Sequence, residues 1–189
     1  MSDASNAKSA GVQTVTLAGG CFWCLEAAYN TIQGIVEVIP GYAGGDAPNP
    51  TYEQVCSGTT GHAEVVQVSF DPKIITLKGV LEIFWAIHDP TTPNRQGGDV
   101  GTQYRSMILY TGAEQKQVAE DSIKTVAKLW KDPIVTELVP LETFYPAEAY
   151  HRHYFEQHPA QAYCQIVINP KLQHLRERFT AQLKPSAGR

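Results

Sequence analysis

The stretch Gly19–Glu26, GGCFWCLE, stands where an extended segment gives way to a helical pattern. Two glycines precede a pair of cysteines three residues apart, and two aromatic residues separate the thiols. The preceding segment, Val12–Ala18, is rich in β-branched residues and predicts a strand. After the pair, apolar residues recur at helical spacing as far as Ile32, and Gly34 is a helix stop signal. The sequence therefore predicts a strand, a glycine turn and a helix with both thiols near its start.

Beyond this stretch, strand and helix patterns alternate loosely, without an internal repeat or a dividing linker. Strands are expected over residues 34–45, 62–72, 104–111 and 134–140, and helices over 76–90, 113–130, 146–158 and 171–183. A loop or short helical turn is expected over 48–62, and a long irregular stretch over 89–103. We expect a flexible N-terminal tail over residues 1–11 and a single α/β or α+β catalytic domain over 12–189, with a mixed sheet covered by helices.

The composition is that of an ordinary globular protein of 189 residues. The formal net charge is −4 and no dense Lys/Arg block is present, which argues against nucleic acid binding. No apolar run approaches the roughly 18 residues needed to span a bilayer, and the N-terminus lacks the pattern of a secretory signal. We therefore expect a cytoplasmic protein that does not bind membranes, in which four cysteines are too few for a disulfide scaffold.

Three interpretations of the cysteine pair are open at this point. The thiols can belong to the buried face of the helix, because Cys is among the most buried residue types. A zinc site would need about four ligands, and His151 and His153 in HRH offer one further closely spaced pair. The third interpretation is redox chemistry, because residues three apart on a helix have Cβ atoms about 5–6 Å apart, near the range that a disulfide closes.

In the redox interpretation the two thiols have different roles. Unpaired N–H groups in the first turn of the helix are expected to lower the pKa of Cys21 and make it the nucleophile. Cys24 would resolve the oxidised Cys21. Phe22 and Trp23 would form apolar walls suited to a small apolar group, such as a methyl group on sulfur.

Several segments together resemble the A-type peptide methionine sulfoxide reductases. They are GGCFWCLEAAY, PGYAGG, PTYEQVCSGTTGHAEVVQVSFDP, FWAIHDPTTPNRQGGDVGTQYRSMI and YCQIVINPKL. The resemblance runs from Thr14 to Phe179, and the separate motifs agree in order and content. It implies an enzyme that reduces the S epimer of methionine sulfoxide, free or in oxidised proteins. The usual dithiol donor of the family is thioredoxin, with glutaredoxin as a second candidate.

The resemblance also implies the residues of the site. Cys21 matches the nucleophilic cysteine of the family, and Phe22 and Trp23 match the aromatic residues that bind the methyl group. Glu64 in GHAEVV matches the catalytic carboxyl. The other matches are Tyr52 and Tyr104, which hydrogen-bond the sulfoxide oxygen, and Asp99, the aspartate of the substrate pocket.

The implied fold is a two-layer α/β sandwich with a mixed β-sheet related to the ferredoxin-like plait and an extended, coiled C-terminal part, and we expect a monomer. Many members of the family have glycine in place of Cys24 and draw the resolving thiol from a C-terminal tail. The tail here, LKPSAGR, contains no cysteine, and a subset of the family with GCFWC supports Cys24 in that role. Cys56 and Cys164 are interpreted as buried or structural thiols. Arg152 in YHRHY stands where glutamine is common, which leaves the role of that segment open.

Sulfoxide reduction needs a general acid, because the oxygen is a poor leaving group until it is protonated. Glu64 alternates in phase with Val66 and Val68 on what we take as the buried face of a strand, where desolvation raises a carboxyl pKa. Cys21 would become a sulfenic acid and then form a disulfide with Cys24, which an external dithiol reopens. No metal, nucleotide or flavin is required. A general thiol-disulfide oxidoreductase is the alternative, and it would use the same thiols without Glu64 or the tyrosine pair.

Overall fold

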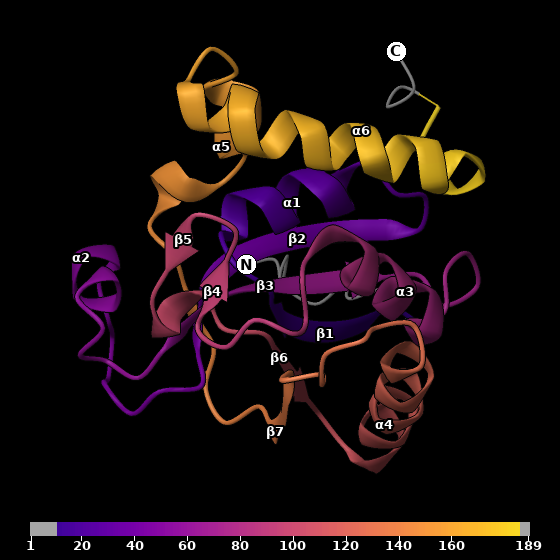
Figure 1. The fold of residues 1–189 in the computed structure, drawn as a ribbon, viewed down its shortest axis with the longest axis horizontal. Coiled ribbons are helices and arrows are strands. Elements are labelled where there is room, and N and C mark those ends of the chain that lie inside the picture. Colours follow the sequence, from indigo (N-terminus) through magenta and orange to yellow (C-terminus); the bar gives the residue numbers. More distant parts are fainter. Residues whose placement is uncertain (1–10, 186–189) are drawn as a thin grey trace, which may run out of the picture.

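The computed structural model describes residues 11–185, and within that range a six-stranded mixed sheet forms the centre of the fold (Figure 1). Its strands are β1 (Gln13–Ala18), β2 (Ile35–Ala43), β3 (Ala63–Phe70), β6 (Met107–Tyr110), β7 (Glu137–Pro140) and β8 (Tyr145–Pro146). Their order is β7-β6-β1-β3-β2-β8, and neighbours pair antiparallel except β6 and β7, which are parallel. A separate hairpin pairs β4 (Arg95–Gln96) with β5 (Asp99–Val100).

Helices occupy the connections between the strands and the C-terminal part of the chain. The longer ones are α1 (Phe22–Asn30), α3 (Leu77–Ile87), α4 (Ala113–Ala127) and α6 (Asn169–Arg178). The shorter segments are α2 (Tyr52–Cys56), α5 (Tyr154–Gln157), the 3-10 turns η1 (Thr102–Tyr104), η2 (Ala149–His151) and η4 (Thr180–Gln182), and the π-helical turn η3 (Cys164–Ile168). Thr76 caps α3, because its side chain accepts a hydrogen bond from the N–H of Gly79 at 3.1 Å.

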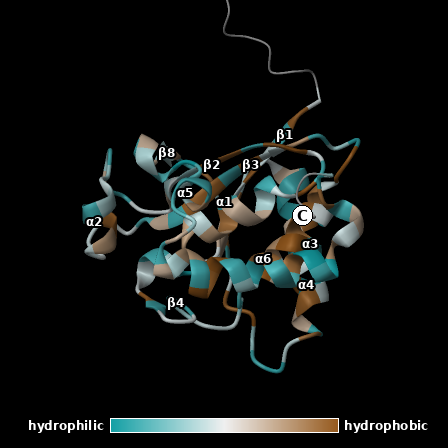
Figure 2. Ribbon diagram, turned by 90° about the horizontal axis from the view of Figure 1, so that it is seen from above, coloured by the Kyte–Doolittle hydropathy of each residue, from teal (hydrophilic) through white to brown (hydrophobic). Residues whose placement is uncertain are grey.

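The longer helices pack on one face of the sheet, and the view from above shows them on the same side of the strands (Figure 2). Their buried side chains form one core with alternate residues of the strands, among them Leu17, Val66, Val68 and Ile108. The opposite face carries a smaller apolar cluster, which Val139, Leu141 and Phe144 cover. The expected mixed sheet with helices packed on it is therefore confirmed.

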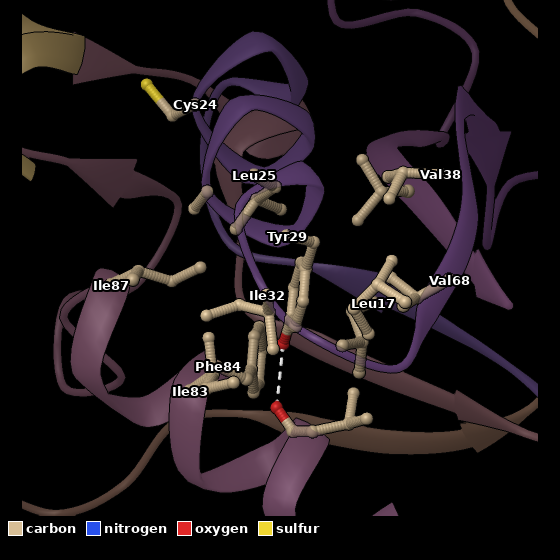
Figure 3. Close-up of a cluster of buried hydrophobic side chains, with 14 of the residues drawn as sticks. Leu17, Cys24, Leu25, Tyr29, Ile32, Val38, Val68, Ile83, Phe84 and Ile87 are labelled. Carbon is tan, nitrogen blue, oxygen red and sulfur yellow. Dashed lines mark hydrogen bonds between the residues drawn. The ribbon is translucent and has the colours of Figure 1, made fainter. Parts of the chain in front are cut away.

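The core beneath α1 holds this helix firmly against the sheet and α3 (Figure 3). Leu25 and Tyr29 are fully buried, and burial of each such side chain contributes roughly 1.5–3 kcal/mol. The Tyr29 hydroxyl donates a 2.8 Å hydrogen bond to the carbonyl of Val80 in α3, so its polar atom is satisfied inside the core. These contacts fix the position of the start of α1, where Cys21 and Cys24 lie.

The turn from β1 into α1 requires its two glycines. Gly20 has φ +91°, which L side chains rarely adopt, and a Cβ there would lie 2.7 Å from Cγ of Gln96. A Cβ on Gly19 would lie 3.0 Å from the Phe84 ring and 3.1 Å from the His88 ring. The pair therefore allows the backbone to pass closely between β4 and α3 and to deliver Cys21 to the end of the sheet.

The prediction of one helix over residues 146–158 is wrong. The segment contains the end of β8, then η2 and α5, with His153 between the two helical turns at φ 54°. Glu26, a buried residue of α1, accepts a 2.7 Å hydrogen bond from the N–H of His153. This contact with a distant helix stabilises a left-handed backbone conformation that local helical periodicity could not indicate.

In the C-terminal part, the last helix differs from the expected range of residues 171–183. The turn η3 leads directly into α6, so the helical region begins before residue 171, and α6 ends at Arg178. Apart from Gly11, the expected flexible tail falls in residues 1–10, outside the described part of the chain. Among residues 11–185, the helices are all too short or too polar to cross a membrane.

Candidate active site

The structure brings Cys21 and Cys24 together where β1 passes into α1. Cys21 is the N-cap residue of α1 and Cys24 lies in its first turn. The two residues are only 6% and 4% exposed, and both are free thiols joined by a side-chain hydrogen bond. The Tyr163 hydroxyl lies 3.8 Å from the Cys24 sulfur. The pair is therefore enclosed by tertiary structure on the side of the C-terminal region.

Glu64 lies beside this pair. It is the second residue of β3, points to the same side as Val66 and is 1% exposed. Its Oε2 accepts a 3.3 Å hydrogen bond from the N–H of Phe22, the residue that follows Cys21. Burial raises the pKa of Glu64 to about 8, and the Phe22 N–H opposes part of that rise. Glu64 therefore carries a proton at neutral pH.

The pKa of Cys21 is raised, so the prediction of a lowered value is wrong. Burial is the largest cause, followed by the hydrogen bond with Cys24 and the negative charges of Cys24 and Glu64. The first N–H group of α1, on Phe22, donates to Glu64 and therefore stabilises the carboxyl group. The pKa of Cys24 is lowered to about 7, mainly by the hydrogen bond with Cys21 and further by Lys171 and Tyr163. In the reduced pair, Cys24 therefore ionises more readily than Cys21.

Aromatic rings gather around the start of α1. Phe22 is fully buried and stacks with Tyr52 of α2 at a centroid distance of 6.3 Å. The half-buried Trp23 lies 6.3 Å from Phe22 and 6.4 Å from Tyr52. Tyr154 of α5 stacks on Trp23 at 3.7 Å with an interplanar angle of 4°. We call Phe22, Trp23, Tyr52 and Tyr154 the aromatic cluster.

Tyr104 and Asp99 reach the same region from the segment between α3 and β6. Burial raises the pKa of Tyr104, and the charges of Glu64 and Asp99 add to this rise. Asp99 in β5 accepts a 2.6 Å hydrogen bond from the Tyr163 hydroxyl. Burial and Glu64 likewise raise the pKa of Tyr52. All the expected site residues therefore lie around Glu64 and the thiol pair, and Tyr163 joins Asp99 to Cys24.

Sequence reasoning missed Tyr163, His151 and Glu148. His151 is fully buried, and its Nδ1 accepts a 3.0 Å hydrogen bond from Nε1 of Trp23. Glu148 accepts hydrogen bonds from the Tyr42 hydroxyl at 2.9 Å and from the N–H of Tyr52 at 3.2 Å. The segments that contain Tyr163 and His151 were singled out in the sequence, but no local pattern connects them with residues more than a hundred positions away.

The remaining thiols and the residues of HRH differ in burial and in their contacts. Cys164 is buried, whereas Cys56 at the end of α2 is exposed, so of the two thiols expected to be buried or structural only Cys164 is buried. Arg152 forms an exposed ion pair with Glu37 of β2 at 3.0 Å. His153 is 49% exposed, whereas His151 is buried. In the described range, no three His, Cys, Asp or Glu side chains are arranged to hold a metal ion.

Comparison with known proteins agrees with this geometry. The family model described as peptide methionine sulfoxide reductase matches residues 13–183. A peptide methionine sulfoxide reductase MsrA of Thermus thermophilus is 55% identical over 173 residues, which cover 92% of this chain and 98% of the relative. The crystal structure of reduced Mxr1 from Saccharomyces cerevisiae is 39% identical with a TM-score of 0.77, over 83% of this chain and 91% of that one.

A further solved structure is that of Mxr1 in complex with Trx2, at 28% identity and a TM-score of 0.56, over 82% of this chain and 92% of that one. The range that the family model matches, residues 13–183, includes the thiol pair, Glu64 and the aromatic cluster. The chain belongs to the peptide methionine sulfoxide reductase family, whose MsrA enzymes reduce methionine sulfoxide.

Proposed function

We propose that this enzyme reduces the S epimer of methionine sulfoxide, free and within oxidised proteins, with Cys21 as the nucleophile. The observation that carries the proposal is the buried Glu64, hydrogen-bonded to the residue that follows Cys21, where burial raises its pKa to about 8 and favours the protonated acid. A thiol alone suffices for disulfide exchange, whereas removal of a sulfoxide oxygen needs a proton donor at the same place. The choice of the S epimer rests on the resemblance to the A-type enzymes.

The surrounding side chains suit both ends of a methyl sulfoxide. In our proposal the methyl group lies against Phe22 and Trp23, and the oxygen accepts hydrogen bonds from Tyr52 and Tyr104. Both tyrosine pKa values are raised, so both hydroxyls keep the protons that they donate as negative charge develops on the oxygen. Asp99, fixed by its hydrogen bond from Tyr163, borders the substrate site.

The first step transfers oxygen from the substrate to Cys21. The Cys21 sulfur attacks the sulfoxide sulfur and its proton leaves, while Glu64 gives its proton to the sulfoxide oxygen. The sulfur–oxygen bond of the substrate breaks, the oxygen ends on Cys21 as a sulfenic acid, and methionine departs. Cys21 is oxidised by two electrons and the substrate is reduced by two. A proton returned to Glu64 restores the acid, so the net step consumes one thiol and one sulfoxide.

Cys24 then resolves the sulfenic acid. Its sulfur forms a bond to the Cys21 sulfur, the sulfenic oxygen leaves as water with the Cys24 proton, and a disulfide remains. In the reduced pair Cys24 is the more acidic thiol, because its hydrogen bond with Cys21 lowers its pKa to about 7. Thioredoxin is the proposed reductant of the disulfide, supported by the solved complex of the yeast relative with Trx2. Glutaredoxin remains a second candidate donor.

The test is a single turnover of reduced enzyme with each epimer of a methionine sulfoxide peptide. We expect about one methionine and the loss of about two thiols per chain with the S epimer, since one thiol attacks and one resolves. Cys24→Ser should complete this first turnover and then fail to recycle with thioredoxin. Cys21→Ser should form no methionine. Equal thioredoxin-dependent activity in Cys24→Ser would contradict the proposed resolving role.

Glu64→Gln separates this proposal from a general thiol-disulfide oxidoreductase. The variant keeps both cysteines, so it should still exchange with a small disulfide such as oxidised glutathione. It should lose most sulfoxide reduction, because the amide cannot transfer the proton. If both activities survived equally, the general oxidoreductase would be the better description.

A further inference from the structure

Arg105 is a largely buried cation beside the site, and the reaction scheme leaves it without a function. It follows Tyr104 directly, at the end of η1, and its side chain is only 13% exposed. Its guanidinium donates hydrogen bonds to three backbone carbonyls, those of Thr102 at 2.9 Å, Gly61 at 2.9 Å and Gly44 at 3.4 Å. A planar guanidinium presents its N–H donors in a fixed arrangement, so the three segments are held in a set geometry.

Two of these carbonyls lie where β2 ends and β3 begins. Gly44 follows Ala43, the last residue of β2, and Ala43 pairs with Ala63, the first residue of β3. Gly61 lies shortly before that strand, and Glu64 is the second residue within it. The guanidinium therefore binds the paired ends of the two strands, close in sequence to the proposed acid.

The loops beyond these strand ends are also tied to each other. Nδ1 of the buried His62 accepts a 3.0 Å hydrogen bond from the N–H of Gly45, so its Nε2 carries the proton and donates to the carbonyl of Ala47 at 2.7 Å. The N–H of Asp46 donates to the carbonyl of Thr60 at 3.3 Å. The two loops thus form one unit, to which the guanidinium attaches η1.

The turn η1 ends with Tyr104, whose hydroxyl has a role in the proposed reaction. The N–H of Tyr104 donates to the carbonyl of Gly101 at 3.0 Å, and the N–H of Arg105 donates to the carbonyl of Thr102 at 3.3 Å. The Arg105 side chain binds the same Thr102 carbonyl, so one acceptor both closes the turn and joins it to the strand ends. A single 3-10 turn has little stability of its own, so its position depends on such attachments.

We propose that Arg105 is a positioning residue, which ties η1 to the ends of β2 and β3 and so holds the Tyr104 hydroxyl beside Glu64 at the sulfoxide oxygen. The inference rests on the proposed function, because it gives Tyr104 the role of donor to that oxygen. Glu137 of β7 lies 3.4 Å from Nε of Arg105, and its side chain is 48% exposed. An ion pair with that much exposure contributes little, so the carbonyl contacts carry the positioning.

A double-mutant cycle tests whether Arg105 acts through Tyr104. Arg105→Met keeps an apolar stem and removes the donors, and it is made in the wild type and in Tyr104→Phe. Glu137→Gln is the matched control, because it removes the charge next to Arg105 and leaves the carbonyl bonds in place. The readouts are the rate of methionine formation in a single turnover at saturating methionine sulfoxide, and stability in urea.

Loss of one well-placed donor to a developing oxyanion costs about 10²–10³-fold in kcat, and Tyr52 remains as a second donor. We therefore expect Arg105→Met to slow the first turnover about 5–50-fold in the wild type and less than about 2-fold in Tyr104→Phe. Glu137→Gln should stay within about 2-fold of the wild type. Equal losses in both backgrounds would overturn the inference, because they would show a general effect on the fold. A loss in Glu137→Gln as large as that in Arg105→Met would overturn it too.

Arg105→Lys gives the same cycle if Arg105→Met does not fold. It keeps the positive charge but lacks the planar fork that binds three carbonyls. We expect a smaller loss of activity that is again greater in the wild type than in Tyr104→Phe. Equal losses in the two backgrounds would again overturn the inference.

Hydrogen exchange tests the attachment of η1 without turnover. In the wild type the N–H of Tyr104 should be protected, and Arg105→Met or Arg105→Lys should reduce this protection. The N–H of Ile75, bonded to the carbonyl of Asp71 at 3.0 Å in the turn before α3, should keep its protection in the variants. Unchanged protection at Tyr104 in the variants overturns the inference without bearing on sulfoxide reduction. A wild type that shows the expected protection but reduces no sulfoxide refutes the proposed function and, with it, the role of Arg105 in the reaction.

Discussion

Replacing Glu64 by glutamine should make the protein more stable and less active at once. The amide has nearly the shape of the carboxyl, and its oxygen can still accept the 3.3 Å hydrogen bond from Phe22. It cannot ionise, so the 1% exposed site would never hold a charge. The substitution therefore removes the ionisation of Glu64 while leaving the packing around it in place.

The expected gain in stability follows from the pKa of Glu64, which burial raises from 4.5 to about 8. Because the folded-state pKa is the higher one, the carboxyl destabilises the fold increasingly as pH rises from 4.5 towards 8, and the effect is absent below the unfolded value. At about 1.4 kcal/mol for each pH unit, the wild type loses about 1 kcal/mol at pH 5, about 3 at pH 7 and about 4 at pH 8. Glu64→Gln should recover these amounts.

The expected loss of activity follows from the proton that the amide cannot give. General acid catalysis contributes about 10²–10⁴-fold, so the first turnover of Glu64→Gln should slow by that factor. The wild-type rate should also fall as pH rises through about 8, where Glu64 loses its proton, and the variant should lack this decline. Rapid-quench measurement of methionine formed by the reduced enzyme, across pH 6 to about 9.5, would show both effects.

Urea denaturation of the reduced wild type and of reduced Glu64→Gln at pH 5, 7 and about 8 measures the difference in their free energies of unfolding. Glu37→Gln is the control, because Glu37 is 49% exposed and its replacement should change stability by less than about 0.5 kcal/mol at each pH. A stability difference between Glu64→Gln and wild type that stays flat from pH 5 to about 8 would refute a raised pKa. Full activity in the variant would refute the role as acid.

Three further outcomes follow from the geometry. Thiolate absorbance of the reduced enzyme should rise near pH 7 and lose that step in Cys24→Ser, whereas a step kept by the variant would place the ionisation elsewhere. Tyr163→Phe should move the same step to higher pH, since the hydroxyl lowers the pKa of Cys24, and an unmoved step would contradict this contact. Gly20→Ala should cost roughly 1–3 kcal/mol in urea denaturation, because of its φ of +91° and the 2.7 Å approach to Gln96, whereas Gly98→Ala, with open space around it, should be near neutral.

The regular elements could be predicted because their signals are local. Residues 63–70 alternate between the two faces of β3, and Glu64 points to the same face as Val66 and Val68, as its phase indicated. The glycine pair before Cys21 likewise marked the turn that its backbone makes. The alternation put Glu64 in phase with the apolar residues, but its burial, like the catalytic roles, was expected only with the family resemblance, because a glutamate at a strand end is more often solvated.

The anchors of the site could not be predicted, because they depend on contacts across the chain. Trp23 and His151 are 128 positions apart, and Cys24 and Tyr163 are 139 positions apart. Helical periodicity favoured one continuous helix through His151, and the buried Glu26 overrides it by binding the N–H of His153. A glutamate on a helix is usually a solvated residue, so nothing in the local sequence marked Glu26 as an anchor.

The predicted pKa of Cys21 failed for a related reason, and the failure changes how the proposed chemistry begins. The N–H of Phe22 at the start of α1 binds Glu64, so it cannot also stabilise a thiolate at Cys21. With the pKa of Cys21 raised, its thiol keeps its proton at rest and is a poor target for oxidants in general. In our scheme the sulfoxide changes this, because Glu64 protonates its oxygen and makes its sulfur electrophilic enough for Cys21 to attack. The hydrogen bond from the start of α1 to Glu64 thus favours reaction with a substrate whose oxygen takes up a proton. Cys24, the more ionised thiol of the reduced pair, acts in the second step.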